Sequence, residues 1–335
     1  MESLNLYNLR SIEKLITKRD GETRFGEKIN FLDAFENLEN SKAKYVLFGI
    51  PEDIGIRANH GKPGAAKAWS ACLKSLLNIQ HNEFTFPDTL ILLGEVDCKP
   101  EMEKAGNIDS SDPNYYAKLG DLVEEIDDKV SRLIEKIVSA GKIPIIIGGG
   151  HNNAFANIKG ASKAINKPVN ILNIDAHTDL RQLEHRHSGN GFSYAKHHDY
   201  LAKYTIFGLH KNYTPQYIFE EIKSNSEFKF QLFEELNLLS KKEHLAAYYS
   251  HLEFLKNQEF GLEVDCDAIV NFPSSAKSPS GFELNMMRNF IKIASEEKNC
   301  KYIHFCEAAP NEQNKDQVGK ALAYFITDFM SKVAD

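Results

Sequence analysis

The chain has 335 residues, of which 42% are hydrophobic and 26% are charged, a composition typical of a folded globular protein rather than a disordered one. Its 47 acidic and 40 basic residues give a net charge of −7, so no basic surplus indicates a nucleic-acid partner. No stretch approaches the ~18 consecutive apolar residues of a membrane span, and the charged N-terminus lacks the apolar core of a secretory signal. The five cysteines are an odd number without a CxxC pair, which favours a reducing, cytoplasmic compartment.

Short apolar runs alternate with longer amphipathic stretches after residue 40, whereas residues 1–40 form a polar, partly helical lead-in segment. Eight runs predict strands, at Tyr45–Gly49, Leu90–Gly94, Ile143–Gly148, Val169–Ile174, Tyr204–Gly208, Phe228–Phe233, Phe260–Val264 and Tyr302–Cys306. Helices are predicted at Leu119–Ala140, Ala154–Ile165, Pro215–Ser224, Lys241–Asn257, Glu283–Glu297 and Lys315–Val333. Nearly all-apolar strands that alternate with helices predict a mainly parallel, eight-stranded sheet in a three-layer α/β/α fold. We expect residues 41–335 to form a single domain, because no Gly/Ser/Pro-rich linker divides them.

Potential metal ligands follow the fourth predicted strand, in the stretch NIDAHTDLR at residues 173–181. Asp175, His177 and Asp179 lie at alternate positions where the apolar run ends. Carboxylate oxygens mixed with imidazole nitrogen suit a borderline-to-hard divalent ion such as manganese. Taken alone, the same residues are equally compatible with a polar turn and a helix cap.

Three other predicted strands end in residues of the same kind. The third ends in GGGH, which delivers His151, and neither GxxxxGK[ST] nor GxGxxG is present there to indicate a phosphate loop. The seventh ends in Asp265 and Asp267, which alternation places on one face together with Glu263. The eighth is followed by Glu307. Because parallel strands present their carboxyl ends at one edge of a sheet, the four strand ends predict a common site.

These motifs resemble those of the ureohydrolase family, which includes arginase, agmatinase, guanidinobutyrase and formimidoylglutamase. The family's GGDH, DAHxD and DxD stand here as GGGH at 148–151, DAHTD at 175–179 and DCD at 265–267. The resemblance implies an arginase-like metallohydrolase fold and two Mn²⁺ ions that activate a shared water for attack on a C=N carbon. It implies ligands for one ion at His151, Asp175, Asp179 and Asp265, and for the other at Asp175, His177, Asp265 and Asp267. Asp175, His177 and Glu307 are the implied catalytic residues, Glu307 holding the cationic amidine or guanidine.

The chain departs from the arginase pattern at three places. Gly150 replaces the acid of GGDH, which removes a side chain expected to support His151. Phe192, at the end of SGNGF, stands where arginase has a histidine assigned to proton transfer. The LDP that follows DxD in arginases is absent, and residues 268–282 read AIVNFPSSAKSPSGF instead. Arginase activity itself is therefore disfavoured.

The substrate prediction depends on Arg181 and on the early loop PEDIGIRANHGKPGA, residues 51–65, both of which resemble formimidoylglutamases. An arginine can hold a carboxylate with two hydrogen bonds, and N-formimidoyl-L-glutamate carries two carboxylates. The resemblance implies hydrolysis of this compound to L-glutamate and formamide, a step of histidine degradation. The candidate substrate contacts are Arg181, Asn190, Glu307, Arg57 and Asn59.

Two alternatives remain open from the sequence. One is an agmatinase- or guanidinobutyrase-like hydrolase of a guanidino compound. The other is a non-catalytic metal-binding regulatory or scaffold protein, which the missing acid at Gly150 and the missing histidine at Phe192 would favour. In each enzymatic interpretation the partner is a small molecule, with no nucleic acid or membrane, and a homo-oligomer is possible.

Overall fold

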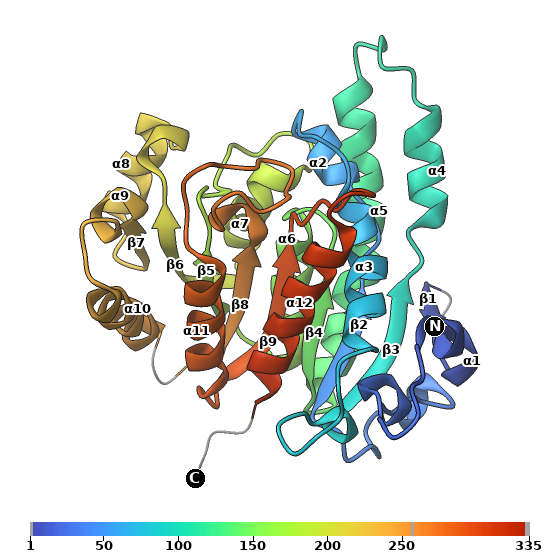
Figure 1. Cartoon of the computed structure of the whole chain (residues 1–335). Coiled ribbons are helices and arrows are strands. Elements are labelled where there is room, and N and C mark those ends of the chain that lie inside the picture. Colours follow the sequence, from blue (N-terminus) through green and yellow to red (C-terminus); the bar gives the residue numbers. More distant parts are fainter. Residues whose placement is uncertain (1–2, 256–257, 332–335) are drawn as a thin grey trace.

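The protein was analysed as a computed structural model that describes residues 3–255 and 258–331. Within these ranges, nine strands form one sheet in the order β1-β3-β2-β4-β9-β8-β5-β6-β7 (Figure 1). Every pairing is parallel except that of β1 with β3. The strands are β1 (Leu4–Leu6), β2 (Tyr45–Gly49), β3 (Leu90–Val96), β4 (Ile143–Ile147), β5 (Val169–Ile174), β6 (Leu201–Leu209), β7 (Phe228–Leu232), β8 (Phe260–Asp265) and β9 (Cys300–Cys306).

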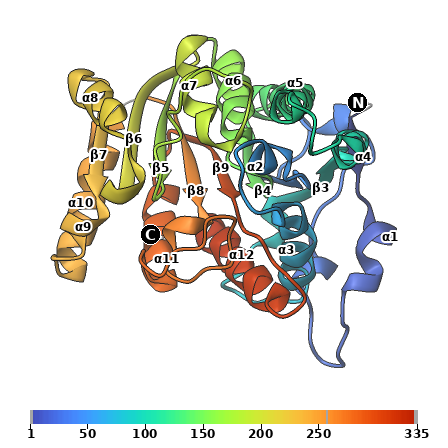
Figure 2. The ribbon, with the colours of Figure 1, turned by 90° about the horizontal axis from the view of Figure 1, so that it is seen from above.

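Helices cover both faces of the sheet (Figures 1 and 2). One layer contains α3 (Ala68–Leu76), α10 (Lys241–Leu255), α11 (Leu284–Ser295) and α12 (Lys315–Met330), and the other contains α5 (Tyr115–Ser139), α6 (Asn153–Ile165), α7 (Gly191–His197) and α8 (Gln216–Ser224). Alternate strand residues point to opposite faces of the sheet and pack against different helical layers. Tyr45 and Leu47 of β2 belong to one buried cluster, and Val46 and Phe48 belong to the other. This explains why the strands read as continuous apolar runs.

The remaining helices are short or lie at the margins of the fold. They are α1 (Leu9–Ile12), α2 (Ile54–Ala58), α4 (Lys99–Asn107) and α9 (Phe233–Leu236). Among the described helices, none combines the length and apolar character needed to cross a membrane.

The three-layer α/β/α prediction is confirmed, with nine strands in place of the expected eight. The additional strand is β1, which comes from the lead-in segment and pairs antiparallel with β3 at the sheet edge. With only three residues, it leaves no recognisable apolar run in the sequence. The same segment buries Ile12 and Phe25 in the core below α3. The predicted helix ends at Asn257 and Val333 lie outside the described residues.

The strand order brings the candidate motifs together. β4, β9, β8 and β5 are consecutive neighbours in the middle of the sheet, and all of their pairings are parallel. These are the four strands that end in GGGH, Glu307, DCD and DAHTD. Their carboxyl ends therefore meet at one edge, where open α/β sheets place their ligand sites.

Candidate active site

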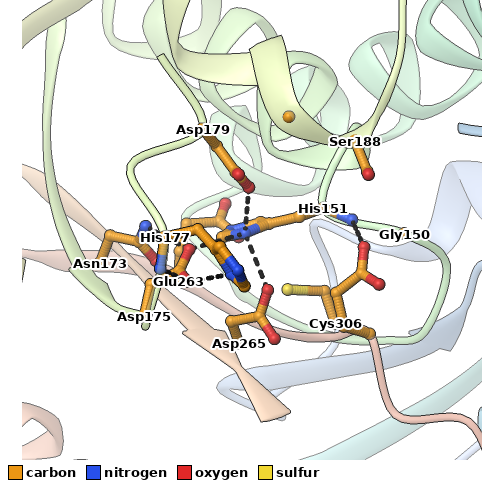
Figure 3. Close-up of polar contacts among 12 residues, drawn as sticks. Gly150, His151, Asn173, Asp175, His177, Asp179, Ser188, Glu263, Asp265 and Cys306 are labelled. Carbon is orange, nitrogen blue, oxygen red and sulfur yellow. Dashed lines mark hydrogen bonds and ion pairs between the residues drawn. The ribbon is translucent and has the colours of Figure 1, made fainter. Parts of the chain in front are cut away.

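The His151 imidazole is the centre of the first group of potential ligands. Its Nδ1 atom lies 2.8 Å from Asp179 Oδ2, 3.2 Å from Asp175 Oδ2 and 3.3 Å from Asp265 Oδ2. Figure 3 shows the three carboxylates turned toward this ring. His151 and Asp175 are fully buried, and these four side chains form one group able to surround a metal ion.

A second group lies beside the first and shares Asp175. His177 Nδ1 is 3.0 Å from Asp267 Oδ2 and 3.6 Å from Asp175 Oδ1. The backbone fixes the carboxylates, because the His177 N–H donates to Asp175 Oδ1 at 2.7 Å and the Asp267 N–H donates to Asp265 Oδ1 at 2.8 Å. In each motif the first aspartate thus caps the turn that presents the next ligand.

The electrostatics of these groups fit divalent cations. In the described part of the chain, no lysine or arginine lies within ion-pair distance of Asp175, Asp179, Asp265 or Asp267. Burial raises the pKa of Asp265, and the charges of Asp267 and Asp175 raise it further. Although burial opposes it, the surrounding acids hold the pKa of His177 well above its usual range. Buried acids packed so closely require positive charge, and carboxylate with imidazole is the ligand set that manganese accepts.

Glu263 supports the far side of the His151 ring. Its Oε2 lies 3.6 Å from His151 Nε2 and 2.6 Å from His304 Nδ1, and its Oε1 accepts from the Tyr302 hydroxyl at 2.9 Å. Burial opposes ionisation, but His304 and His151 lower the pKa of Glu263 to about 2. A carboxylate behind a ligating histidine orients the ring and increases its basicity. The sequence placed Glu263 on the correct strand face, yet it was not among the candidate site residues.

The Cys306 sulfur lies close to His151 and Glu263, but it suits manganese less well than the carboxylates do. Its side chain, with His151 and Glu263, forms a third group of potential ligands. Burial raises the pKa of the Cys306 thiol well above its usual range, and the charge of Asp265 adds to this. Manganese prefers carboxylate oxygen and imidazole nitrogen to sulfur, which favours the other two groups as the metal positions.

Phe192 closes the apolar side of the His151 ring. Its ring is fully buried, meets His151 edge-on at 5.2 Å between centroids and stacks on Tyr204 at 4.4 Å. The Tyr204 hydroxyl in turn accepts from Asn173, which also donates to Asp175 Oδ2 at 2.9 Å. Phe192 therefore packs against the site and provides no group for proton transfer.

A cavity of about 450 Å³ opens onto the ligand groups. It is lined by four of the six candidate ligands, His177, Asp179, Asp265 and Asp267, and by Glu307, Arg181, Asn59, Ser188, Ser275, Tyr213 and Tyr217 among others. A larger groove of about 1060 Å³ lies between the lead-in segment and α4 and α5, away from these groups. The smaller cavity is the candidate active site because the buried titratable residues converge on it.

Glu307 presents a carboxylate to this cavity from a strained backbone. Its φ is +60°, and Asp179 has φ +48°, both in the left-handed region that non-glycine residues uncommonly adopt. Glu307 Oε1 accepts from the His151 N–H at 2.7 Å, and Oε2 accepts from the Ser275 hydroxyl. Burial raises the pKa of Glu307 to about 8, while these two donors act against the rise.

Arg181 and Asn59 form a pair at the cavity wall. Arg181 Nη1 donates to Asn59 Oδ1 at 2.9 Å, and Asn59 Nδ2 donates to Ser188 Oγ at 3.1 Å. A Cβ at Gly189 would lie 2.9 Å from Arg181 Cδ, so the glycine provides room for the arginine side chain. Both residues line the cavity beside the candidate metal ligands, and their contact with a substrate stays a prediction.

Two expected substrate contacts point elsewhere. Arg57 Nη2 donates to the Ala105 carbonyl at 2.7 Å, which joins α2 to α4, and its side chain does not line the cavity. Asn190 Oδ1 accepts from Arg186 Nη1 at 2.6 Å and Asn190 Nδ2 donates to the His185 carbonyl, so its amide braces its own loop. Neither side chain lines the cavity, and contact of Arg57 or Asn190 with a substrate stays a prediction.

Comparison with known proteins was made for both sequence and structure. A formimidoylglutamase of Geobacillus sp. is 24% identical over 334 residues, covering 95% of this chain and 94% of that relative. One from Aromatoleum aromaticum is 35% identical over 153 residues, covering 44% of this chain and 40% of that relative.

Solved structures share the fold. Formimidoylglutamase from Bacillus subtilis has a TM-score of 0.75 at 16% identity, covering 94% of this chain and 93% of its own. Trypanosoma cruzi formiminoglutamase with Mn²⁺ has a TM-score of 0.73 at 18% identity, and the match covers 92% of this chain and 98% of that one. A family model described as the arginase family matches residues 43–331. Since this match spans most of the chain, the protein belongs to the arginase family.

Proposed function

We propose that the chain hydrolyses N-formimidoyl-L-glutamate with the help of two Mn²⁺ ions. The observation that carries the proposal is that Arg181 and Glu307 line the same cavity as the candidate metal ligands. A cation-binding and an anion-binding side chain in one site match a substrate with a cationic formimidoyl group and carboxylates. The curated relatives named formimidoylglutamase support this choice over the guanidino hydrolases.

The two ions would be held by the six residues expected from the sequence. One ion would be held by His151, Asp175, Asp179 and Asp265, and the other by Asp175, His177, Asp265 and Asp267. The structure brings the first set together in full, and it brings together the second set except for Asp265. When bound, a manganese pair lowers the pKa of a water molecule and polarises the C=N group. Nδ1 of His151 and Oδ1 of Asp267 are buried and, among the described residues, have no hydrogen-bond partner, which fits atoms that would bind a metal ion.

The chain's own residues bind and orient the substrate. The Glu307 carboxylate, in its ionised form, accepts hydrogen bonds from the cationic formimidoyl nitrogens, and the His151 N–H and Ser275 hydroxyl hold it in place. Arg181, braced by Asn59, pairs with a substrate carboxylate. Hydrolysis adds the elements of water across the C–N bond and releases formamide and L-glutamate. We expect this reaction to take place in the cytoplasm, and a homo-oligomer stays a prediction.

A steady-state assay of the manganese-loaded chain tests the proposal. The substrates are N-formimidoyl-L-glutamate, arginine, agmatine and 4-guanidinobutyrate at equal concentrations. We expect turnover of the formimidoyl compound alone. If only a guanidino compound is hydrolysed, that compound is the substrate and the formimidoyl assignment is wrong. If two metals bind but none of the four compounds is hydrolysed, the protein is a non-catalytic metal-binding protein.

A further inference from the structure

The glycine turn that delivers His151 has no side chain of its own to hold it. Gly148, Gly149 and Gly150 precede the histidine, and Gly150 stands where the related motif has an acid. A buried carboxylate reaches this turn from another part of the chain. It belongs to Glu52, which follows β2 and is fully buried.

Glu52 accepts hydrogen bonds on both carboxylate oxygens. Oε1 accepts from the Gly150 N–H at 3.0 Å, from Asn153 Nδ2 at 2.6 Å and from Asn152 Nδ2 at 3.2 Å. Oε2 accepts from the N–H groups of Ile54, at 2.7 Å, and Gly55, at 3.4 Å. Burial and the charge of Asp53 raise the pKa of this carboxyl, and the donors from Asn153 and Gly150 act against the rise. All five partners are donors, so the side chain acts as an acceptor throughout.

The glycines make this contact possible. Gly149 has φ +72°, and a Cβ there would lie 2.7 Å from Glu52 Oε1 and 2.2 Å from Asn153 Nδ2. A Cβ at Gly150 would lie 2.4 Å from Asn152 Oδ1 and 2.8 Å from Ile56 Cγ1. With these neighbours in place, an acid at position 150 has no room. The carboxylate that supports the turn therefore has to come from outside it.

We propose that Glu52 is a positioning residue for the metal ligand His151, supplying from the segment between β2 and α2 the carboxylate that the glycine turn lacks. Consecutive N–H groups of the turn bind different carboxylates, Gly150 to Glu52 and His151 to Glu307. The peptide that carries the imidazole is thus held from two sides, which fixes Nδ1 relative to Asp175, Asp179 and Asp265. This role rests on the proposed dinuclear site, because it concerns the ion that His151 would hold.

Glu52→Gln is the informative variant. A glutamine keeps the size of the side chain but turns one oxygen into an NH₂ group, which faces N–H donors whichever way the amide is oriented. The turn then loses hydrogen bonds to Glu52, and the His151 imidazole is held less firmly in place. Changes to groups that orient a metal ligand typically weaken metal affinity by about 10–100-fold. Glu52 lies outside the cavity lining, so substrate affinity should change little.

The experiment titrates the metal-free, full-length chain with MnCl₂ and follows it by calorimetry and electron paramagnetic resonance. Glu101→Gln is the matched control, since Glu101 is also a buried glutamate, bound to Lys129 at 2.7 Å and outside the candidate active site. We expect the wild type and this control to bind two ions and to give the spectrum of a coupled pair. In Glu52→Gln one ion should bind about 10–100-fold more weakly, with an isolated-ion spectrum at low MnCl₂. Saturating MnCl₂ should restore kcat while KM stays unchanged.

Several results would overturn this role. Two ions bound by Glu52→Gln with wild-type affinity would do so directly. If that variant fails to fold, Asn153→Ala removes one of the donors to Glu52 and should weaken the same ion to a smaller extent; wild-type affinity there would equally overturn it. A wild-type chain that does not bind two ions contradicts the dinuclear site itself, which is a distinct failure that removes the basis for both proposals.

Discussion

We expect the discrimination between anionic and cationic substrates to depend on Arg181. Its guanidinium lines the cavity and its position is fixed by Asn59. A guanidinium at this place attracts a substrate carboxylate and repels a second cationic group such as the amine of agmatine. Removing it should affect binding of the substrate more than the chemical step, because Arg181 is not among the candidate metal ligands.

Arg181→Ala is expected to raise KM for N-formimidoyl-L-glutamate by about 10–100-fold with a small change in kcat, since a hydrogen bond to a charged group contributes roughly 1.5–3 kcal/mol. Steady-state kinetics measure both constants. Arg132→Ala, at an exposed arginine of α5 outside the cavity, is the control. An unchanged KM in Arg181→Ala would remove this residue from substrate binding.

Ser275 is expected to tune the pH at which Glu307 binds its substrate. Burial raises the pKa of Glu307 to about 8, and the Ser275 hydroxyl, which favours the ionised form, acts against that rise. Only the ionised carboxylate attracts the cationic formimidoyl group, so kcat/KM should increase as the pH rises through this pKa. In Ser275→Ala the ascending limb should move to higher pH, while in Ser280→Ala, exposed on the same loop, it should stay in place. Coincident profiles for the wild type and Ser275→Ala would contradict the role of the hydroxyl.

The side chains that form the two groups of potential ligands could be predicted from the sequence, whereas the residues that support them could not. DAHTD and DCD place their acids at fixed intervals, and a strand end is visible in a single stretch of sequence. Glu52 and Ser275 act on residues about 100 and 32 positions away, at Gly150 and Glu307. Nothing local marks such partners, because the contact exists only once β2, β4 and β9 are side by side.

A buried ion pair joins the loop after β5, which bears Arg181, to helix α5. Arg186, in the loop after β5, donates through Nε to Asp127 of α5 at 2.9 Å and through Nη2 to the Asn152 carbonyl at 2.9 Å. Both charged side chains are buried, and the guanidinium also lies over the rings of Phe155 and Tyr194. One side chain thus joins α5, the loop that bears Arg181 and the turn beyond His151.

Arg186→Met should destabilise the protein by about 3–5 kcal/mol, because it leaves the Asp127 charge buried without a partner. Urea unfolding followed by circular dichroism measures the change. The double variant Arg186→Met with Asp127→Leu should recover part of the loss, since it removes both charges. A single variant as stable as the wild type would show that the ion pair does not hold the loop.

The positions of the strands along the chain could be predicted from the hydrophobic pattern, but the order of the strands in the sheet could not. All eight predicted strands are present, because strands buried on both faces are uninterrupted apolar runs. The three-residue β1 is too short to give such a signal. The neighbours of β9 are β4 and β8, more than 150 and about 40 residues away, so only tertiary packing determines that the four strands followed by candidate site residues are adjacent.

On the scale of the whole molecule, both helical layers contribute to stability, and a buried histidine makes that stability dependent on pH. His251 of α10 is 1% exposed, contacts Thr205 of β6 and packs against the ring of Phe207. Burial lowers the pKa of His251 to about 3, and the charge of Lys229 adds to this effect. The residue is therefore neutral in the folded protein over most of the acid range.

His251→Gln should make the metal-free protein less sensitive to acid. Between about pH 6.5 and pH 3 the unfolded chain binds a proton at His251 that the native state does not, so the contribution of neutral burial is complete above about pH 6.5 and is lost as the pH falls toward 3. This term amounts to at most about 5 kcal/mol. Denaturant unfolding at pH 7, 5 and 4 measures it. If the variant and the wild type lose the same free energy of unfolding between pH 7 and pH 4, His251 is not the origin of the acid sensitivity.

We expect the ends of β4, β5 and β8 to hold a pair of manganese ions, with Glu307 after β9 facing them. Anomalous X-ray diffraction at the manganese absorption edge, from crystals of the manganese-loaded protein, tests this. Two peaks about 3.5–4 Å apart are expected, one beside His151 and one beside His177, with Asp175 next to both. A single peak, or peaks remote from these residues, would contradict it.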